Sequence, residues 1–342
     1  MNPRLRRPAS CAIHPAMPTR RLGTRRFRTA IIRPPAGTDW RARLAAADAE
    51  LAADYREARA PSAWRAVRAT RRMLLMALWT LLAIPIQAAC LAIGGRPPVV
   101  FARWYHAVLC RIGGIRVRMI GTPATSEPGR PVLFLCNHQS WADVLVLGGR
   151  LEACFISKAE VGTWPLIRTV AKLGRTVYVS RRRGATAREK DELASRLARG
   201  DSLILFPEGT TSDGARILPF RSALVGAVEA AEIRPIVQPV SLVFDRLDGL
   251  PVTRPHRPHF SWYGDMNIAR HAWTLLGRRS CRATILLHQP LDPASFPDRK
   301  ALAEAAYQAV DQGAAALRQG RDARPLSLKH HGPEPASPPD RA

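Results

Sequence analysis

A histidine and an aspartate five residues apart are the pair in this chain best placed to do proton chemistry together. His138 and Asp143 follow a short apolar run, Val132–Cys136. If a helix begins just after the histidine, the carboxylate lies about one turn away and can return to the imidazole. Asp143 could then hold one ring nitrogen as an N–H donor and leave the other as a base. A surface histidine beside a helix-capping aspartate is the alternative, because it gives the same spacing.

A polar turn follows a second apolar run. Ser202–Phe206 leads directly into Pro-Glu-Gly-Thr at 207–210. The proline and glycine end the strand and leave backbone N–H groups and hydroxyls that could hold an anion. An ordinary turn between a strand and the next element is the alternative.

Three consecutive arginines, Arg181–Arg183, follow a third apolar run, Thr176–Val179. Sites in α/β proteins form at the carboxyl edge of the sheet, so Arg181 is expected at the same edge as His138. A guanidinium there could bind a phosphate with two hydrogen bonds. For the other two arginines a solvated charge run is the alternative.

From residue 115 onward, short apolar runs alternate with helical stretches, a pattern typical of α/β proteins. The predicted strands are Val132–Cys136, Cys154–Ser157, Thr176–Val179, Ser202–Phe206, Ile236–Phe244 and Thr284–His288. The clearest predicted helices are Ala187–Arg199 and a final one over about Asp298–Leu317. Because the strands are nearly continuous apolar runs, we expect helices on both faces of the sheet.

Residues 73–95 form one long apolar stretch without a charge. As a helix it would be about 35 Å long, enough for a bilayer core of about 30 Å. Pro85 in its middle predicts a kink or a break, and a second semi-apolar stretch, 98–114, follows Gly94-Gly95. Arginines flank the segment on both sides, so a hairpin that dips into one leaflet is favoured over a single span, with a buried core helix as the third alternative.

The chain therefore divides into four parts. Residues 1–60 are predicted to be a basic, largely disordered arm with a possible short helix at 41–60, and 61–114 a membrane-associated helical segment. Residues 115–320 are predicted to form the α/β domain and 321–342 a disordered tail, because the two ends are too polar to offset their ordering entropy.

The net charge is +25, from 52 lysines and arginines against 27 acidic residues. Such a chain is attracted to nucleic acid or to an anionic membrane. Its 8 Trp, 5 Tyr and 9 Phe form no stacking-module pattern, so no nucleic-acid partner is expected, and a basic nucleic-acid-binding protein is kept only as a remote alternative. The six cysteines contain no C-x-x-C pair, which excludes a disulfide scaffold and the usual zinc spacings. Cys136 is expected to pack rather than react, and His256 and His259 lack further ligands, so no metal is expected.

Four blocks in order resemble the glycerolipid acyltransferase family. They are Asn137-His138-x4-Asp143, Gly174…Arg181, Phe206-Pro207-Glu208-Gly209-Thr210 and Val237-Gln238-Pro239-Val240. Their order and spacing agree with the family over about residues 100–290. The resemblance implies a single mixed sheet covered by helices, preceded by the membrane-associated segment.

The resemblance also implies the reaction, transfer of a fatty acyl group from an acyl thioester to the free hydroxyl of a lysolipid. Acyl-CoA or acyl-carrier protein would be the co-substrate, with no cofactor. The acceptor expected first is 1-acyl-sn-glycerol-3-phosphate (lysophosphatidate), giving phosphatidic acid. Lyso-ornithine lipid is the alternative, because the Thr-Thr-Ser-Asp-Gly form of the third block resembles a proteobacterial branch that includes both activities. The expected location is the cytoplasmic face of the bacterial inner membrane.

By the same resemblance, His138 would take the hydroxyl proton while Asp143 orients it. The residues expected at the acceptor's polar head are Arg181, Glu208, Gly209 and Thr210. Lys158, at the end of the second predicted strand, is expected to help stabilise the oxyanion. A carboxylate repels phosphate, so Glu208 is expected to hold Arg181 or a glycerol hydroxyl.

Overall fold

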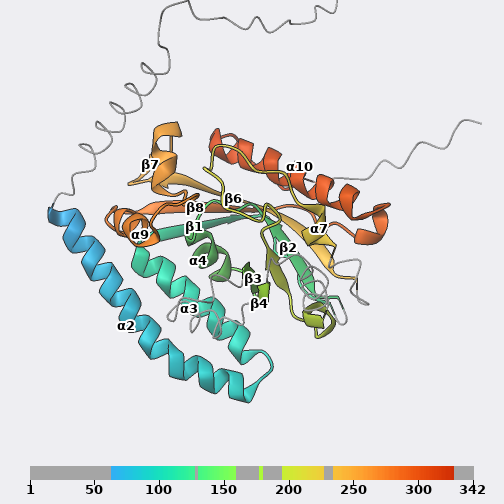
Figure 1. Ribbon diagram of the computed structural model, residues 1–342, viewed down its shortest axis with the longest axis horizontal. Helices are drawn as coiled ribbons and strands as arrows, with labels where there is room; N and C mark the ends of the chain where they lie inside the picture. The colour runs from blue at the N-terminus through green and yellow to red at the C-terminus, as the bar shows by residue number, and fades with distance from the viewer. Residues whose placement is uncertain (1–62, 128–129, 159–176, 180–194, 227–233, 327–342) are drawn as a thin grey trace, which may run out of the picture. The chain divides into compact units, whose positions relative to one another are not determined.

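The computed structural model describes residues 63–127, 130–158, 177–179, 195–226 and 234–326. The predicted basic arm, residues 327–342 of the predicted tail and most of the predicted helix Ala187–Arg199 lie outside these residues. Within them, eight strands form one mixed sheet with helices on both faces (Figure 1). The predicted fold class is confirmed.

Most strands of the sheet run parallel to one another, and the others run in the opposite direction. The strands are β1 (Ile115–Ile120), β2 (Val132–Cys136), β3 (Cys154–Lys158), β4 (Val177–Val179), β5 (Leu203–Leu205), β6 (Ile236–Leu247), β7 (Leu250–Pro251) and β8 (Cys281–Leu287). Their order is β1-β8-β6-β2-β5-β3-β4, with β7 paired to β6. Because β7 and β8 each pair antiparallel with β6, and β1 runs parallel to β8, the strands β1, β7 and β8 run opposite to the others.

All six predicted strands are present, with small shifts at their ends, and two strands were not predicted. The sequence of β1 alternates apolar residues with arginines, so it contains no apolar run. The other missed strand, β7, is only two residues long.

The helices divide between the two faces of the sheet (Figure 1). They are α2 (Ala63–Ile93), α3 (Pro97–Gly113), α4 (Ala142–Gly148), α7 (Ser222–Val225), α9 (Ile268–Leu276) and α10 (Arg299–Arg318), with 3-10 turns η2 (Arg254–His259) and η3 (Pro293–Ser295). One face is covered by α10 and the other by α3 and α4. The Asp298 side chain accepts the backbone N–H groups of Lys300 and Ala301, which begins α10 as predicted.

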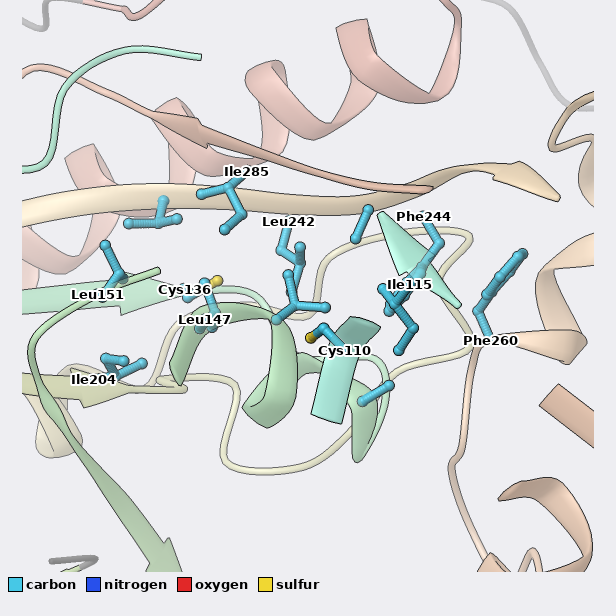
Figure 2. Packing of buried hydrophobic residues seen from close by; sticks show 14 of the residues in the cluster. Cys110, Ile115, Cys136, Leu147, Leu151, Ile204, Leu242, Phe244, Phe260 and Ile285 are labelled. Atoms are coloured by element: carbon cyan, nitrogen blue, oxygen red, sulfur yellow. The ribbon is translucent and has the colours of Figure 1, made fainter. Parts of the chain in front are cut away.

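The core has a layer on each face, and β2 contributes to both. Val132, Phe134 and Cys136 belong to the cluster on the α4 side, part of which Figure 2 shows. Leu133 and Leu135 belong to the cluster on the α10 side. All five side chains are buried, which explains why this strand is a continuous apolar run and not an alternating one.

A buried polar chain holds α10 against the sheet. The Leu326 N–H donates to His288 Nδ1 (3.2 Å), so the ring carries its hydrogen on Nε2 and donates it to Ser241 Oγ (2.9 Å). The Ser241 hydroxyl donates in turn to the Val310 carbonyl in α10 (2.8 Å). Burial lowers the pKa of His288 to about 4 and keeps the ring neutral.

The polar chain leaves no room for a side chain at Gly313. A Cβ at this position of α10 would lie 2.6 Å from both Ser241 Oγ and His288 Cε1. The helix can therefore approach the sheet closely only at a glycine. Residues 321–326, which the sequence analysis assigned to the tail, also pack here, with Ala323 buried and Leu326 hydrogen-bonded to the sheet.

Before the sheet, α2 and α3 form a helical hairpin (Figure 1). The chain does not break at Pro85, since α2 continues through it to Ile93. Two glycines, Gly94 and Gly95, adopt positive φ values of 75° and 66° and turn the chain into α3. Beyond the proline, Gln87 Nε2 donates to the Pro98 carbonyl (3.0 Å) and ties the two helices together.

A buried arginine fastens α2 to the α/β domain. The Arg72 guanidinium donates to the carbonyls of Leu276 (2.9 Å), Arg278 (2.6 Å) and Arg279 (2.9 Å), at the C-terminal end of α9. These carbonyls include ones that a helix end leaves without an internal partner, and the helix dipole favours a positive charge there. Arg72 therefore acts within the protein and is not part of a basic flank that faces lipid.

We predict that Arg72→Ala destabilises the fold, because it leaves three carbonyls without their donor. The free energy of unfolding should fall by about 2–4 kcal/mol. Thermal unfolding of the full chain in detergent measures the loss of stability. Arg71→Ala is the matched control, because Arg71 precedes Arg72 in α2 and is exposed. Equal losses from the two variants would contradict the assignment.

Candidate active site

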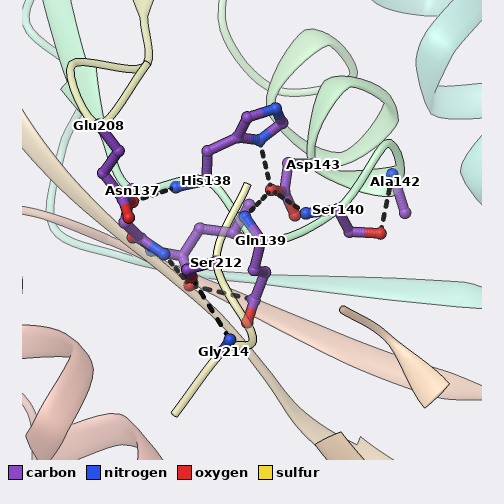
Figure 3. A network of polar contacts seen from close by, with 10 residues as sticks. Asn137, His138, Gln139, Ser140, Ala142, Asp143, Glu208, Ser212 and Gly214 are labelled. Carbon is purple, nitrogen blue, oxygen red and sulfur yellow. Dashed lines mark hydrogen bonds and ion pairs between the residues drawn. The ribbon is translucent and has the colours of Figure 1, made fainter. Parts of the chain in front are cut away.

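The parallel pairing of β2 and β5 brings two of the predicted site residues together. Leu135 lies opposite Leu205 in the sheet, so the residues three positions further on, His138 and Glu208, leave the sheet side by side. The Glu208 Oε1 accepts the backbone N–H of His138 (2.7 Å; Figure 3). Both residues lie at the carboxyl edge of these strands, where α/β proteins place their sites.

Asp143, in the first turn of α4, reaches back to the loop before it. One carboxylate oxygen, Oδ2, accepts hydrogen bonds from His138 Nδ1 (2.9 Å), the Gln139 N–H (2.7 Å) and the Ser140 N–H (2.8 Å). The Asp143 side chain is fully buried, while that of His138 is 19% exposed. Since a carboxylate only accepts, Nδ1 carries the hydrogen and Nε2 is the free basic nitrogen.

The loop that carries His138 is also held by the neighbouring strand and by the turn after β5. Asn137 exchanges two hydrogen bonds with the Leu242 backbone, donating from Nδ2 (2.9 Å) and accepting at Oδ1 (2.8 Å). The Ser212 N–H donates to the His138 carbonyl (2.9 Å). The imidazole is therefore fixed from three elements, which is the support that a base needs to stay in its productive geometry.

Phe206 is a site residue that the sequence analysis missed. Its ring stacks on the His138 imidazole, with centroids 3.9 Å apart and planes 13° apart. An aromatic face stabilises a cation above it, so this contact favours the imidazolium that forms when His138 takes a proton. The sequence could have indicated this role, because Phe206 lies at the end of a predicted strand, directly before Pro207 and Glu208.

Glu208 is used differently from the expectation. Its carboxylate is 1% exposed, and the oxygen that does not bind His138 accepts the Leu218 N–H (2.8 Å). Burial raises the pKa of Glu208 to about 7, and the two N–H donors oppose that rise. Both oxygens are bound to backbone, so we assign Glu208 to positioning the His138 loop; its contact with the acceptor stays a prediction.

Four further predicted residues lie at or after the carboxyl ends of the strands β3, β4 and β5. Gly209 has a positive φ of 70° in the turn after β5, and Thr210 is exposed next to it. Lys158 is the last residue of β3, and its side chain lies outside the described part of the chain, as does all of Arg181. Their roles in binding stay predictions.

Cys136, two residues before His138, is fully buried. Burial raises the pKa of this thiol well above its usual range, with Asp143 and Glu208 adding to the rise. A protonated thiol is a poor nucleophile, so Cys136 packs in the core.

The arrangement fits a family that comparison with known proteins identifies. The acyltransferase family model matches residues 116–243, which include His138, Asp143 and Glu208. A lyso-ornithine lipid O-acyltransferase from Brucella abortus is 39% identical over 206 residues, which are 58% of this chain and 76% of that protein. A 1-acyl-sn-glycerol-3-phosphate acyltransferase from Neisseria gonorrhoeae is 27% identical over 196 residues, 56% of this chain and 72% of that protein.

A solved structure agrees with the fold. The crystal structure of a 1-acyl-sn-glycerophosphate acyltransferase from Thermotoga maritima superposes with a TM-score of 0.52 at 19% identity, covering 73% of this chain and 98% of that one. With the family model and the Brucella relative, the assignment rests on sequence and fold together. This chain is an acyltransferase and belongs to the glycerolipid acyltransferase family.

Proposed function

We propose that this enzyme transfers a fatty acyl group from an acyl thioester to the free hydroxyl of a lysolipid. The observation that carries the proposal is the hydrogen bond between His138 Nδ1 and the buried Asp143, which leaves Nε2 as a base at the carboxyl edge of the sheet. A base held in this way is what an alcohol needs in order to attack a thioester.

In the proposed mechanism, His138 Nε2 takes the proton from the acceptor hydroxyl as its oxygen attacks the thioester carbonyl carbon. The carbon–sulfur bond then breaks, and the proton on Nε2 passes to the departing thiolate. Asp143 stabilises the transient imidazolium from one side and the Phe206 ring from another. General-base catalysis of this kind contributes about 10²–10⁴ in rate.

The acceptor that the similarity favours is lyso-ornithine lipid. The relative with that activity is 39% identical to this chain, against 27% for the relative that acts on 1-acyl-sn-glycerol-3-phosphate. This reverses the order expected from the sequence. Lysophosphatidate is the second candidate, supported by the family blocks and by the Neisseria relative.

We propose that the enzyme works at a membrane surface, on the cytoplasmic face of the inner membrane. Helix α2 is long and apolar enough to cross a bilayer by length and composition. Large apolar side chains stand exposed along it, including Trp64, Leu74, Leu78, Leu81, Leu82 and Ile93. Contiguous exposed apolar surface of this kind marks contact with a membrane or a partner, and both substrates carry long acyl chains.

The reaction is tested with the purified full-length chain in detergent micelles. Lyso-ornithine lipid and lysophosphatidate are offered in parallel, each with acyl-CoA or acyl-carrier protein as donor, and thiol release is followed together with lipid product. We expect the ornithine acceptor to react about tenfold faster or more. His138→Ala should lower the rate by about 10²–10⁴, whereas the exposed His256→Ala should not.

The two parts of the proposal fail separately in this assay. Absence of thiol release with every acceptor and donor would contradict acyl transfer. Faster turnover of lysophosphatidate would leave acyl transfer standing and replace the acceptor.

Asp143→Asn tests the role of charge at the base. The amide oxygen can still accept the Gln139 and Ser140 N–H groups, so the loop should keep its geometry while the negative charge beside His138 is lost. We expect kcat to fall by about 10²–10⁴ with little change in either KM. Asp322→Asn, at an exposed position, serves as the control. A variant with normal kcat would refute the assignment of Asp143.

A further inference from the structure

A cavity lined by several arginines lies beside the His138 loop. It has a volume of about 240 Å³ and is formed where β6 ends and β8 begins, near the last turn of α10 and the η2 turn. Gln139 and Gly214 line it on the side of the loop. In Figure 3 the Gln139 side chain points away from the His138 ring and toward Gly214. The cavity is therefore adjacent to the base along the chain, and the Gln139 side chain reaches it from the residue after His138.

The charge of this cavity is unbalanced. Its lining contains the arginines Arg246, Arg257, Arg282 and Arg318 and one acidic residue, Asp245. The carboxylate of Asp245 is committed to Arg282, whose Nε lies 3.0 Å and 3.1 Å from its two oxygens. The remaining three arginines have no lining carboxylate of their own.

Arg257 and Arg318 both line the cavity and repel each other electrostatically. Arg257 forms no ion pair with the described part of the chain. Arg318 has a long contact to the half-exposed Asp311 (3.8 Å), and its own side chain is only 13% exposed. Burial lowers the pKa of Arg318, Asp311 opposes that fall, and the nearby Arg257 adds to it. Asp213 and Glu208 act on Arg318 from beyond ion-pair distance. Two like charges held together in a partly buried site are unfavourable unless an anion lies between them.

A buried hydroxyl points to the same ligand. Ser261 lines the cavity, is 1% exposed, and its Oγ has no hydrogen-bond partner among the described residues. Buried polar atoms are nearly always hydrogen-bonded, so this one calls for an explanation. A Cβ at Gly214 would lie 2.6 Å from this Oγ and 2.7 Å from Gln139 Oε1, so the glycine keeps the space beside both polar groups open.

We propose that this cavity is an oxyanion-binding site, in which Arg257, Arg318 and the Ser261 hydroxyl hold a carboxylate or phosphate group of a substrate. The guanidinium groups supply only donors and the hydroxyl can donate one further hydrogen bond, which together suit an oxyanion. The source of the oxyanion is the headgroup of the acceptor or the phosphates of the acyl donor, and this part rests on the proposed function. Binding of a free oxyanion does not depend on it.

The test uses the full-length enzyme in detergent with Arg257→Gln, Arg318→Gln and Ser261→Ala. The matched controls are Arg254→Gln, exposed on the same η2 turn, and Arg321→Gln, exposed just beyond α10. The KM values for acceptor and donor are measured separately, each with the other substrate saturating. The rise in melting temperature with inorganic phosphate, against chloride at equal ionic strength, gives a readout that needs no turnover.

We expect the pocket variants to raise the KM of one substrate by about tenfold or more, with kcat changed far less and both controls unaffected. A higher acceptor KM assigns the site to the headgroup, and a higher donor KM assigns it to the donor phosphates. Loss of stabilisation by phosphate in the variants, without a change in either KM, would overturn the assignment of the site to a substrate.

Ser261→Ala separates binding from folding. Removing a buried hydroxyl without a partner should not lower the melting temperature, so a KM change in this variant cannot come from unfolding. The proposal is overturned if the pocket variants match the controls in both KM values and in the response to phosphate. That result would leave acyl transfer at His138 untouched, since the thiol-release assay tests it independently.

Discussion

The site depends on the parallel register of β2 and β5. Because Leu135 lies opposite Leu205, the loop with His138 and the turn with Glu208 emerge next to each other, and a side chain of one can bind the backbone of the other. The carboxylate that orients the imidazole then comes from the following helix, five residues away along the chain. Strand pairing brings the two loops together, and a local turn brings the Asp143 carboxylate to the imidazole.

Whether a contact of the site or the fold could be predicted from the sequence depends on how far apart its residues lie along the chain. His138 and Asp143 interact within one loop, so their types and spacing were enough to predict the pair. Asn137 binds the Leu242 backbone 105 residues away, and Arg72 binds carbonyls more than 200 residues away. No periodicity or motif reports such contacts, because they exist only once the sheet order is set.

Glu208 shows a different limit. The sequence identifies a carboxylate in a turn beside the base, but it does not show which way the side chain faces. In the structure it turns inward to two backbone N–H groups. Pro85 shows the same limit, because the cost of about 3 kcal/mol for a proline inside a helix does not break α2. The cost of a proline inside a helix can be predicted from the sequence. The tertiary contacts of the helix cannot.

The close approach of α10 to the sheet has an evolutionary consequence. Gly313, Ser241 and His288 fill one small volume from three elements, and a methyl group at the glycine would collide with both partners. Relatives that carry a larger residue at the position of Gly313 are expected to carry smaller ones at the positions of Ser241 and His288. The three positions should covary as a unit, although they lie far from the reacting groups.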